Sequence, residues 1–591
     1  MTTADAVYSW LAAFEGALSG GDLQRVANLF APECFWRDMV AFTWSIQTSE
    51  GPPAIAQMLA RQLSHVRPSG WRVEGTPKSN PEGWTEGWVT FETAAGPGRG
   101  HVRIINGKCW TLLTTLISLN GHEPATGTRR PLGVDLQIKR GRQTWAQQSA
   151  GRKERLGISD DPDVLIIGAG QGGLSLAARL KQLGVPALIL EKGASPGHSW
   201  RKRYPSLCLH DPVWYDHMPF LPFPPDWPLF TPKDRMADWL EAYAKVLDLD
   251  CWTNTTCASV RYDDVAKQWT VTAVRDGREM TLRAAHLVFA TGMSGYPHVP
   301  TFPGADTFRG TQLHSSKYPG GASLAGQRAV VIGSNTSAHD ICADLWEHGR
   351  DVTMVQRSGT LVARYSSVLE FLLSPLYSEE ALARGIDTET ADYLATTWPH
   401  RLVERRNKPI CKAMRARDQD LHDRLTAVGF RLDFGPDETG LALKSIREGG
   451  GFYTDVGASE LICNGDIKLA SGTGVGRLTA DGVVLTDGRT LAADLIVYAT
   501  GYRSMNEFVA DIVGRDVADA VGRCWGVVSA TRKDPGPWEG ELRNMWKPTA
   551  HEALWFQGGN LAQSRHFSRF LALQLKARLV GVPVQVYRPT V

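Results

Sequence analysis

The first 125 residues combine two helical patterns with a series of short alternating runs. Apolar side chains recur at helical spacing over residues 7–18, and a second helix is expected over residues 23–30, after a Gly-Gly-Asp stop. Runs such as 87–92 and 101–105 alternate apolar and polar positions between turn residues, which predicts antiparallel strands. Helices followed by a curled sheet predict an α+β cone over residues 1–125.

The rest of the chain follows a different pattern. Residues 126–160 are rich in Gly, Pro and basic side chains and are expected to form a linker, with a short polar helix over 143–150 that Gly151 stops. After the linker, short apolar strands alternate with helical stretches, which predicts parallel sheets covered by helices. Residues 360–450 have a mostly helical pattern, for example over 381–406, and are expected to form an insertion.

A buried strand after the linker runs into a glycine turn formed by Gly168, Gly170 and Gly173, and a helix follows. In this pattern the first glycine permits the tight turn, the second lets the backbone approach a pyrophosphate, and the third lets the helix pack on the strand. The pyrophosphate then meets the free N–H groups of the helix N-terminus. The next strand ends in Glu191, where a carboxylate accepts ribose hydroxyls. These features together predict a dinucleotide site rather than a tight turn alone.

A second unit repeats the strand and the turn but departs from the pattern at two of three glycines. Gly333 keeps the first position, while Asn335 takes the second and Ala338 the third. Alanine is a known variant at the third position, and asparagine tolerates left-handed backbone better than other non-glycine residues. The following strand ends in Arg357, which suits a 2′-phosphate and favours NADPH over NADH. The alternative for Arg357 is a solvated surface residue.

Between the two units, Phe308, Gly310, His314 and Tyr318 form an FxGxxxHxxxY pattern. With this motif the chain resembles the flavin-containing monooxygenases, within the wider class that includes Baeyer–Villiger enzymes. Further segments that match the family are Gly197–Trp200 with Tyr204–Pro205, the strands ending in Ala290–Gly292 and Ala499–Tyr502, and Gln557–Asn560. The first 125 residues are similar to the NTF2-like (SnoaL-like) cone that precedes the type II members of the family.

The resemblance implies FAD in the first unit and NADPH, with NADH as an alternative, in the second. It implies an enzyme that forms a C4a-(hydro)peroxyflavin and inserts one oxygen atom into a small organic substrate. The reaction is N- or S-oxygenation, Baeyer–Villiger oxidation of ketones, or both. The implied fold is α/β, with two nested Rossmann-type domains behind the cone: FAD-binding segments at 161–320 and 496–591, and an NADPH-binding segment at 321–495.

The candidate site residues follow from the two turns and the matching segments. The cofactor contacts are expected from Gly168, Gly170, Gly173, Glu191, Trp200, Thr291, Gly333, Ser334, Asn335, Thr336, Ser337, Arg357, Thr500, Gly501 and Asn560. His314 of the motif is a candidate catalytic residue. Familiar family members carry an Asn after the Trp–Tyr–Pro block, whereas here His210 and Asp211 stand in that segment, either as its replacement or as part of a structural Asp-Pro turn. An acid or base at that place would influence the protonation of the oxygen adduct.

In the cone, Trp36, Arg37 and Asp38, together with Trp44, have two interpretations. They form either a pocket group for a small apolar ligand or a structural Arg–Asp pair at a strand end, which we favour. We expect the cone to be accessory, in contact with the nicotinamide domain or with a partner subunit.

Composition and charge narrow the range of partners. Lys and Arg number 64 and Asp and Glu 62, so the formal charge is only +2. We therefore expect neither nucleic acid nor an anionic membrane as a partner. A small-molecule substrate and O2 are the partners that the resemblance implies. The first residues lack the basic region of a signal peptide, and no run reaches about 18 apolar residues. A cytoplasmic protein is expected, and a homodimer is compatible with the sequence.

The cysteines bear on the rival functions. Nine are scattered without a CxxC pair, so we expect no metal site and no dithiol motif. That disfavours a flavin disulfide reductase, which shares the tandem dinucleotide-binding plan. The sequence leaves two more functions open, an NADPH oxidase and a non-catalytic flavin-binding or assembly protein. Asn335 is the only support for the non-catalytic protein.

Overall fold

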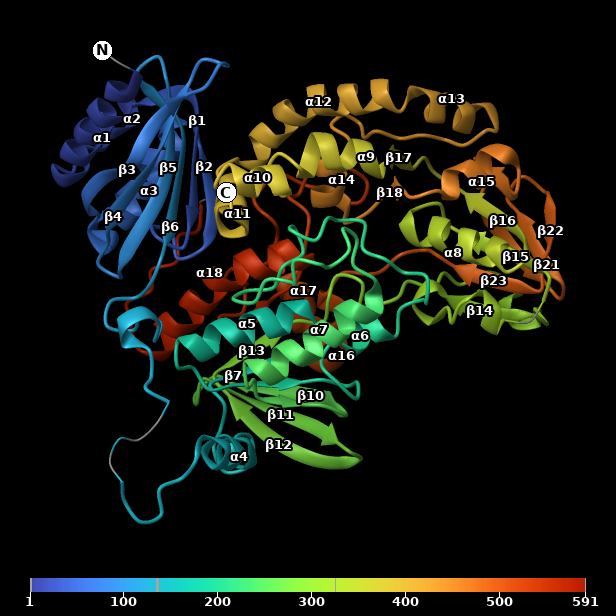
Figure 1. The fold of residues 1–591 in the computed structure, drawn as a ribbon, viewed down its shortest axis with the longest axis horizontal. Helices are drawn as coiled ribbons and strands as arrows, with labels where there is room; N and C mark the ends of the chain where they lie inside the picture. The colour runs from blue at the N-terminus through green and yellow to red at the C-terminus, as the bar shows by residue number, and fades with distance from the viewer. Residues whose placement is uncertain (1–2, 134–135, 137, 325, 590–591) are drawn as a thin grey trace.

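The computed structural model describes residues 3–133, 136, 138–324 and 326–589. It consists of an N-terminal domain, two units built on parallel sheets, and a mainly helical insertion (Figure 1). In Figure 1 the N-terminal domain stands at one end and the second unit at the other, while the first unit lies between and below them. The helical insertion extends along the top, from the N-terminal domain to the second unit.

The N-terminal domain packs three helices against one six-stranded sheet with the order β2-β1-β6-β5-β4-β3. Its elements are α1 (Thr3–Ser19), α2 (Leu23–Asn28), β1 (Phe30–Met39), β2 (Ile46–Glu50), α3 (Gly51–Val66), β3 (Ser69–Ser79), β4 (Thr85–Glu92), β5 (Pro97–Ile105) and β6 (Lys108–Leu116). The predicted antiparallel strands are confirmed, although β1 and β6 form a parallel pair. The helix expected over 23–30 ends at Asn28, because Phe30 begins β1 and pairs with Cys109.

Aromatic rings fill the interior of this domain. The members of the cluster are Phe14, Phe30, Trp36, Phe42, Trp71 and Phe91. Trp36 belongs to this core, and its indole N–H donates to Thr114 Oγ1 at 2.8 Å. Trp44 is also buried, with 5% of its surface exposed. Both tryptophans are therefore packed in the domain.

The favoured pairing of Arg37 with Asp38 is wrong. Neighbouring residues of a strand point to opposite faces of the sheet. Asp38 faces the domain interior, where Oδ2 accepts the hydroxyl of Thr43 at 2.7 Å and Oδ1 accepts that of Thr114 at 2.6 Å. Arg37 points the other way, toward the body of the protein, and bonds Glu541.

The first parallel sheet has the order β24-β13-β7-β8-β9. Its elements are β7 (Val164–Ile167), α5 (Gln171–Gln182), β8 (Ala187–Leu190), α6 (His198–Arg201), α7 (Lys233–Val246), β9 (Cys251–Trp252), β13 (His286–Phe289), α16 (Asn506–Ile512), α17 (Arg515–Val521), β24 (Leu554–Phe556) and α18 (Leu561–Leu579). An antiparallel layer is formed by β10 (Thr255–Asp263), β11 (Gln268–Arg275) and β12 (Arg278–Ala284). Because β24 pairs with β13, the C-terminal part of the chain completes this sheet.

The second parallel sheet has the order β14-β23-β15-β16-β19. The unit contains β14 (Thr311–His314), β15 (Arg328–Ile332), α8 (Thr336–Glu347), β16 (Asp351–Gln356), α15 (Ala458–Asn464), β19 (Ile467–Ser471) and β23 (Leu495–Tyr498), with an antiparallel layer of β20 (Val475–Thr479), β21 (Gly482–Leu485) and β22 (Thr490–Ala492). The predicted parallel sheets are confirmed in both units. β14 precedes residue 321, where the second unit was expected to begin, but it pairs with β23 of the second sheet.

The insertion between β16 and β19 is mainly helical. It contains β17 (Leu361–Arg364), α9 (Tyr365–Val368), a π-helical turn (Leu369–Leu373), α10 (Glu379–Ala383), α11 (Thr388–Thr396), α12 (His400–Arg417), α13 (Gln419–Ala427), α14 (Leu441–Glu448) and β18 (Phe452–Asp455). The helix expected over 381–406 is divided among α10, α11 and α12. Pro399 disfavours helical backbone at the residue before it, so α12 begins only at His400.

The linker contains a 3-10 turn (Gly127–Arg129) and the α-helix α4 (Trp145–Arg155). The helix continues through Gly151, where it was expected to stop, because a single glycine only weakens a helix. Arg152 in its last turn bonds Asp248 of the first unit at 2.7 Å, which holds the helix in place. Among the described residues, no helix combines the length and the apolar character needed to cross a membrane.

Candidate active site

The first glycine turn leaves open space at the start of α5. Gly168 has φ +108°, and a Cβ there would lie 2.6 Å from the carbonyl oxygen of Ala290. A Cβ at Gly173 would lie 2.0 Å from the carbonyl oxygen of Gly168, so the chain itself requires both glycines. At Gly170, φ is −80° and the atom nearest to a Cβ would be Ser199 Oγ, 3.9 Å away. The space at Gly170 therefore fits a pyrophosphate at the helix N-terminus.

Polar groups around this turn suit the rest of a dinucleotide. Glu191 follows β8, and its two carboxylate oxygens accept backbone N–H groups at 2.8 and 2.7 Å. Each oxygen keeps a lone pair that a ribose hydroxyl can use. Thr291 Oγ1 is buried beside the turn and has no hydrogen-bond partner among the described residues. Trp200 donates its indole N–H to Gln171, the first residue of α5, at 3.0 Å.

The second glycine turn has the same backbone path. Gly333 has φ +132°, and a Cβ there would lie 2.3 Å from the carbonyl oxygen of Ala499. Asn335 has φ −96°, so the left-handed conformation that we expected it to tolerate does not occur. Its side-chain oxygen accepts the hydroxyl of Thr360 at 3.2 Å, and the same hydroxyl lies 2.7 Å from Ser334 Oγ. Thr360 therefore holds the Asn335 side chain by a specific bond.

A cavity of about 960 Å³ begins at this second turn and reaches the first unit. At the turn it is lined by Gly333, Ser334, Asn335, Thr336 and Ser337, with Arg357, Thr500 and Gly501 nearby, and toward the first unit by Met293 and Ser294. Its charged lining residues are Arg357, Arg447, Arg503, Arg523, Lys533, Arg543 and Glu448. Arg357 is exposed and makes no hydrogen bond or ion pair with another described residue. The excess of positive charge suits a polyanionic dinucleotide.

The FxGxxxHxxxY motif connects several elements of the second unit. His314 ends β14, donates Nε2–H to the carbonyl oxygen of Gly501 at 3.0 Å, and accepts the N–H of Ser316 on Nδ1 at 3.1 Å. Burial lowers the pKa of His314, so the ring is neutral at neutral pH. The Tyr318 hydroxyl donates to Asp344 of α8 at 2.6 Å. The motif thus joins β14 to the turn at Gly501 and to α8.

His210 and Asp211 lie on the irregular segment between α6 and α7, and His210 faces α8 and β18. His210 Nε2 is 3.9 Å from one oxygen of Asp340 in α8, and Tyr204 donates its hydroxyl to the other oxygen at 2.7 Å. Burial raises the pKa of Asp211 to about 6, against the opposing effect of His210. Asp216 is buried nearby, and its carboxyl oxygens have no partner among the described residues; burial, and then Asp211, raise its pKa well above the usual range.

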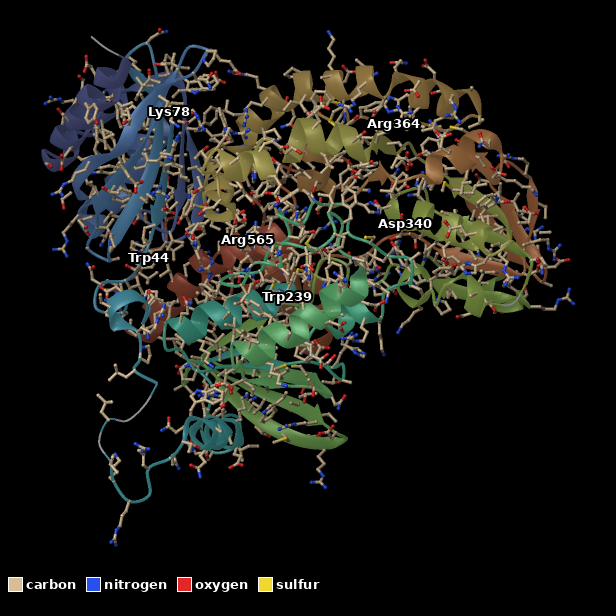
Figure 2. The ribbon with its side chains drawn as sticks, viewed as in Figure 1. Trp44, Lys78, Trp239, Asp340, Arg364 and Arg565 are labelled. Carbon is tan, nitrogen blue, oxygen red and sulfur yellow. The ribbon has the colours of Figure 1, made fainter. Side chains whose placement is uncertain are left out.

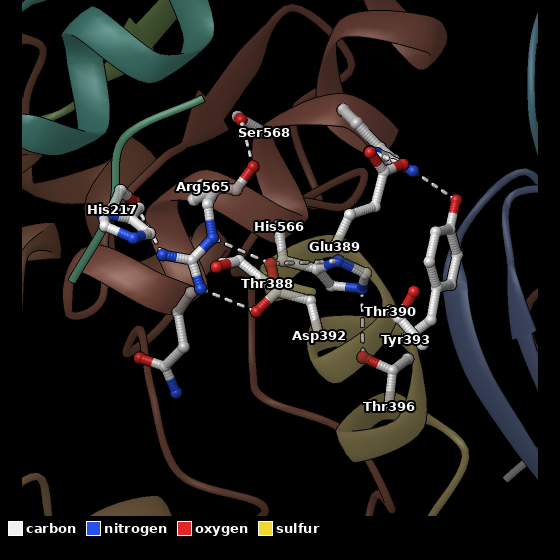
Figure 3. Close-up of polar contacts among 12 residues, drawn as sticks. His217, Thr388, Glu389, Thr390, Asp392, Tyr393, Thr396, Arg565, His566 and Ser568 are labelled. Atoms are coloured by element: carbon white, nitrogen blue, oxygen red, sulfur yellow. Dashed lines mark hydrogen bonds and ion pairs between the residues drawn. The ribbon is translucent and has the colours of Figure 1, made fainter. Parts of the chain in front are cut away.

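Arg565 of α18 supports this segment, and the sequence pattern did not indicate it (Figures 2 and 3). Its Nε and Nη2 donate to the two carboxylate oxygens of Asp392 at 2.8 and 2.7 Å. Its Nη1 donates to the carbonyl oxygens of Tyr215 and His217 at 2.7 and 2.6 Å. Arg565 therefore joins α18, α11 and the segment that carries Asp211. The sequence signal for Arg565 is a charged residue within a helix whose side chains are buried on nearly all faces.

The predicted residues gather in three places. Gly168, Gly170, Gly173, Glu191, Trp200 and Thr291 surround the first turn. Gly333, Ser334, Asn335, Thr336, Ser337, Arg357, Thr500 and Gly501 line the cavity, with His314 bonded to Gly501. Asn560 belongs with the segment of His210 and Asp211, because it caps α18 and donates its side-chain N–H to the Tyr215 hydroxyl at 3.0 Å.

Comparison with known proteins identifies the family. Residues 165–448 match the family model described as pyridine nucleotide-disulphide oxidoreductase. The chain is 33% identical over 344 residues to indole-3-pyruvate monooxygenase YUCCA1 of Oryza sativa subsp. japonica. The aligned region covers 58% of this chain and 77% of that relative. The match to YUCCA6 of Arabidopsis thaliana is 33% over 345 residues, covering 58% and 76%. The chain belongs to the flavin-containing monooxygenase family.

As a flavin-containing monooxygenase, the protein is an oxidoreductase that acts with O2 and uses FAD and NADP(H). The fold agrees with this membership. A crystal structure of cyclohexanone monooxygenase bound to epsilon-caprolactone superposes with a TM-score of 0.51 at 20% identity, covering 71% of this chain and 88% of that one. The family model leaves residues 1–164 unmatched, so the likeness of the N-terminal domain to the NTF2-like cone stays a prediction.

Proposed function

We propose that this monooxygenase binds FAD at the first glycine turn and NADPH at the second, and transfers one oxygen atom from O2 to a small organic molecule. The observation that carries the proposal is the open space at Gly170 together with the cation-lined cavity that begins at the second turn. Met293, which follows the turn at Gly292, lines the same cavity and so connects the two sites. When bound, the reduced flavin supplies the reaction with O2.

The chain's own residues orient the cofactors and control protons. Asp211, with a pKa of about 6, exchanges a proton near neutral pH and is the candidate acid or base at the reacting centre. His314 is neutral and both of its ring nitrogens are bonded, so its proposed role is to hold the turn at Gly501. His210 connects the Asp211 segment to the NADPH-binding helix through Asp340.

The substrate class that we propose is a small ketone or 2-oxo acid, with sulfides and amines as alternative oxygen acceptors. The two plant relatives are named for indole-3-pyruvate, a 2-oxo acid with an aromatic side chain. Trp525, Arg447 and Arg543 line the cavity, with Trp525 beside Met293 at Gly449, and they offer an aromatic face and positive charge to such an anion. A carbonyl substrate requires an anionic oxygen donor, which a nearby positive charge would stabilise.

Two measurements test the proposed function. Anaerobic addition of NADPH is expected to bleach the flavin absorption, whereas a non-catalytic flavin-binding protein would stay yellow. Under air, an aryl methyl sulfide is expected to give the sulfoxide, a cyclic ketone the lactone, and an aryl 2-oxo acid an oxygenated product. Sulfoxide without any product from either carbonyl substrate contradicts the ketone assignment. Hydrogen peroxide alone, across the whole panel, indicates an NADPH oxidase.

Arg357 is expected to select NADPH. Because the side chain is exposed at the cavity without a partner among the described residues, Arg357→Ala removes a charge-assisted contact to the 2′-phosphate. Such a contact is worth roughly 1.5–3 kcal/mol, so the KM for NADPH should rise about 10- to 100-fold, while the KM for NADH changes little. Arg477→Ala, at an exposed position of β20 outside the cavity lining, serves as the control. Equal losses with both cofactors would refute the assignment.

A further inference from the structure

One wall of the cavity is an irregular segment between α17 and β24. Residues 522–553 form neither helix nor strand, and they contribute Arg523, Cys524, Trp525, Lys533 and Arg543 to the cavity lining. Trp525 has φ +72°, a left-handed conformation that bulky side chains rarely adopt. Such a conformation persists only where the surrounding structure holds it, so the contacts of Trp525 determine the shape of this wall.

Arg543 holds Trp525 within the segment. The backbone N–H of Trp525 donates to the carbonyl oxygen of Arg543 at 3.0 Å, and Arg543 Nη2 donates back to the carbonyl oxygen of Trp525 at 3.0 Å. The same Nη2 donates to Asp534 Oδ1 at 2.5 Å. Trp525 in turn donates its indole N–H to the carbonyl oxygen of Ser445. A shift of the backbone near Arg543 would therefore move Trp525 and change the cavity wall.

The N-terminal domain binds this segment from the outside. Arg37 of β1 donates Nε–H to Glu541 Oε1 at 2.6 Å and Nη2–H to Oε2 at 2.8 Å, and the Thr48 hydroxyl donates to Oε1 at 2.7 Å. The side chains of the ion pair are 4% and 3% exposed. Burial opposes the ionisation of Glu541, but Arg37, together with His400 and Thr48, outweighs it and lowers the pKa of Glu541 to about 2. Glu541 stands two residues before Arg543, so the ion pair fixes the backbone that carries Trp525.

Arg37 is also connected, through α11, to the segment between α6 and α7 that contains Asp211. Its Nη1 donates to the carbonyl oxygen of Thr396, at the end of α11, at 2.8 Å. The same helix carries Asp392, the partner of Arg565 (Figure 3). One buried guanidinium thus contacts both the cavity segment and the helix that supports the Asp211 segment.

We infer that Arg37 is a positioning residue for the monooxygenase reaction: through Glu541 it holds the wall formed by Trp525 and Arg543 closed against water. The inference rests on the proposed function, because oxygen transfer to the substrate requires a site from which water is excluded. When the wall is loose, NADPH, O2 and a proton are converted to NADP+ and hydrogen peroxide, and the substrate is left unoxidised. Loss of Arg37 should therefore separate NADPH consumption from product formation.

Arg103 provides a matched control. It is a buried arginine of the same domain, and it binds the insertion through Thr397, with Nη2 2.7 Å from the hydroxyl and Nη1 3.1 Å from the carbonyl oxygen. Its guanidinium carbon lies 3.6 Å from the ring centre of Trp398. Among the described residues, its hydrogen bonds reach Glu86, Thr111 and Thr397 but not the 522–553 segment. A general loosening of the domain therefore affects both variants, whereas a loss of the cavity wall affects only Arg37→Met.

The test compares the holoenzymes of the wild type, Arg37→Met and Arg103→Met with an aryl methyl sulfide under air. In Arg37→Met, sulfoxide formed per NADPH consumed should fall about tenfold, with peroxide replacing it, since small misplacements at an active site cost one to two orders of magnitude. The KM for NADPH should stay within about twofold, because the Arg357 contact is intact. Amide hydrogen exchange over residues 522–553 should become faster in Arg37→Met and stay as in the wild type in Arg103→Met.

The inference is overturned if Arg37→Met forms as much sulfoxide per NADPH as the wild type and exchanges its amide hydrogens over residues 522–553 at the wild-type rate. It is also overturned if Arg103→Met changes in both measurements as much as Arg37→Met does. If Arg37→Met fails to fold because Glu541 is left buried without its arginine partner, Arg37→Met/Glu541→Leu removes both charges of this pair and is expected to fold with the same uncoupling. A double variant that forms as much sulfoxide per NADPH consumed as the wild type also overturns the inference. A wild type that oxygenates no substrate contradicts the proposed function alone, and the exchange comparison then decides whether Arg37 holds the segment.

Discussion

Replacing Gly170 by valine is expected to give a folded protein that binds no FAD. The backbone at Gly170 is extended, and the atom nearest to a Cβ there is 3.9 Å away, so the chain accommodates a side chain at this position. The branched side chain then occupies the space that a pyrophosphate needs at the N-terminus of α5. FAD affinity should fall at least about 100-fold, or about 2.7 kcal/mol. The flavin absorption of the purified protein measures the loss, and circular dichroism checks the fold.

Gly173→Ala serves as the contrasting variant. A Cβ at Gly173 would lie 2.0 Å from the carbonyl oxygen of Gly168, so even alanine should distort the turn and destabilise the first unit. Gly170→Val that purifies with a full complement of flavin contradicts the placement of FAD at this turn. Gly170→Val that is unfolded contradicts the interpretation of the space as a ligand site.

Arg565→Met is expected to cause the largest loss of stability among single substitutions near the site. The methionine leaves Asp392 as a buried carboxylate without its cation, and it removes the two bonds to the carbonyl oxygens of Tyr215 and His217. Breaking a buried ion pair at one partner costs about 3–5 kcal/mol. The measurement is the free energy of unfolding by urea denaturation, followed by fluorescence and by circular dichroism so that separate unfolding of the domains is seen.

A double variant separates the stability lost through the unpaired buried charge from the stability lost through the missing arginine side chain. Arg565→Met/Asp392→Leu removes both charges and should recover a large part of the stability, since no unpaired carboxylate stays buried. The loss of the bonds to the Asp211 segment persists in the double variant, so its oxygenation rate should stay low. If the free energy of unfolding of Arg565→Met lies within about 1 kcal/mol of that of the wild type, the role assigned to the ion pair is contradicted.

Much of the two dinucleotide units was predictable because local sequence specifies them. Gly173 is required by a contact within one strand, turn and helix, since a Cβ there would meet the carbonyl oxygen of Gly168, and the backbone N–H that Glu191 accepts lies only 22 positions away. The N-terminal helices and strands were predictable for the same reason. The helix expected over 381–406 failed at two places, after Ala383 and after Thr396. At the second, its apolar spacing carried more weight in the prediction than Pro399.

Strand geometry could also have excluded the pairing of Arg37 with Asp38. The alternation of side chains in β1 places Trp36 and Asp38 on one face and Arg37 on the other. The pattern alone therefore predicts that Arg37 leaves the interior of its domain. It does not indicate where the guanidinium finds its partner.

The sequence by itself determined the two glycine turns, Glu191 and the motif that contains His314, because short spacings encode them. Only the tertiary structure decided the partners of Arg37 and Arg565. Arg37 bonds Glu541 across 504 positions, and Arg565 bonds Asp392 across 173. A buried charge requires an opposite charge or several hydrogen bonds, since its desolvation is otherwise too costly. That requirement can be met by any distant segment, and which segment meets it depends on how the N-terminal domain, the insertion and α18 pack together.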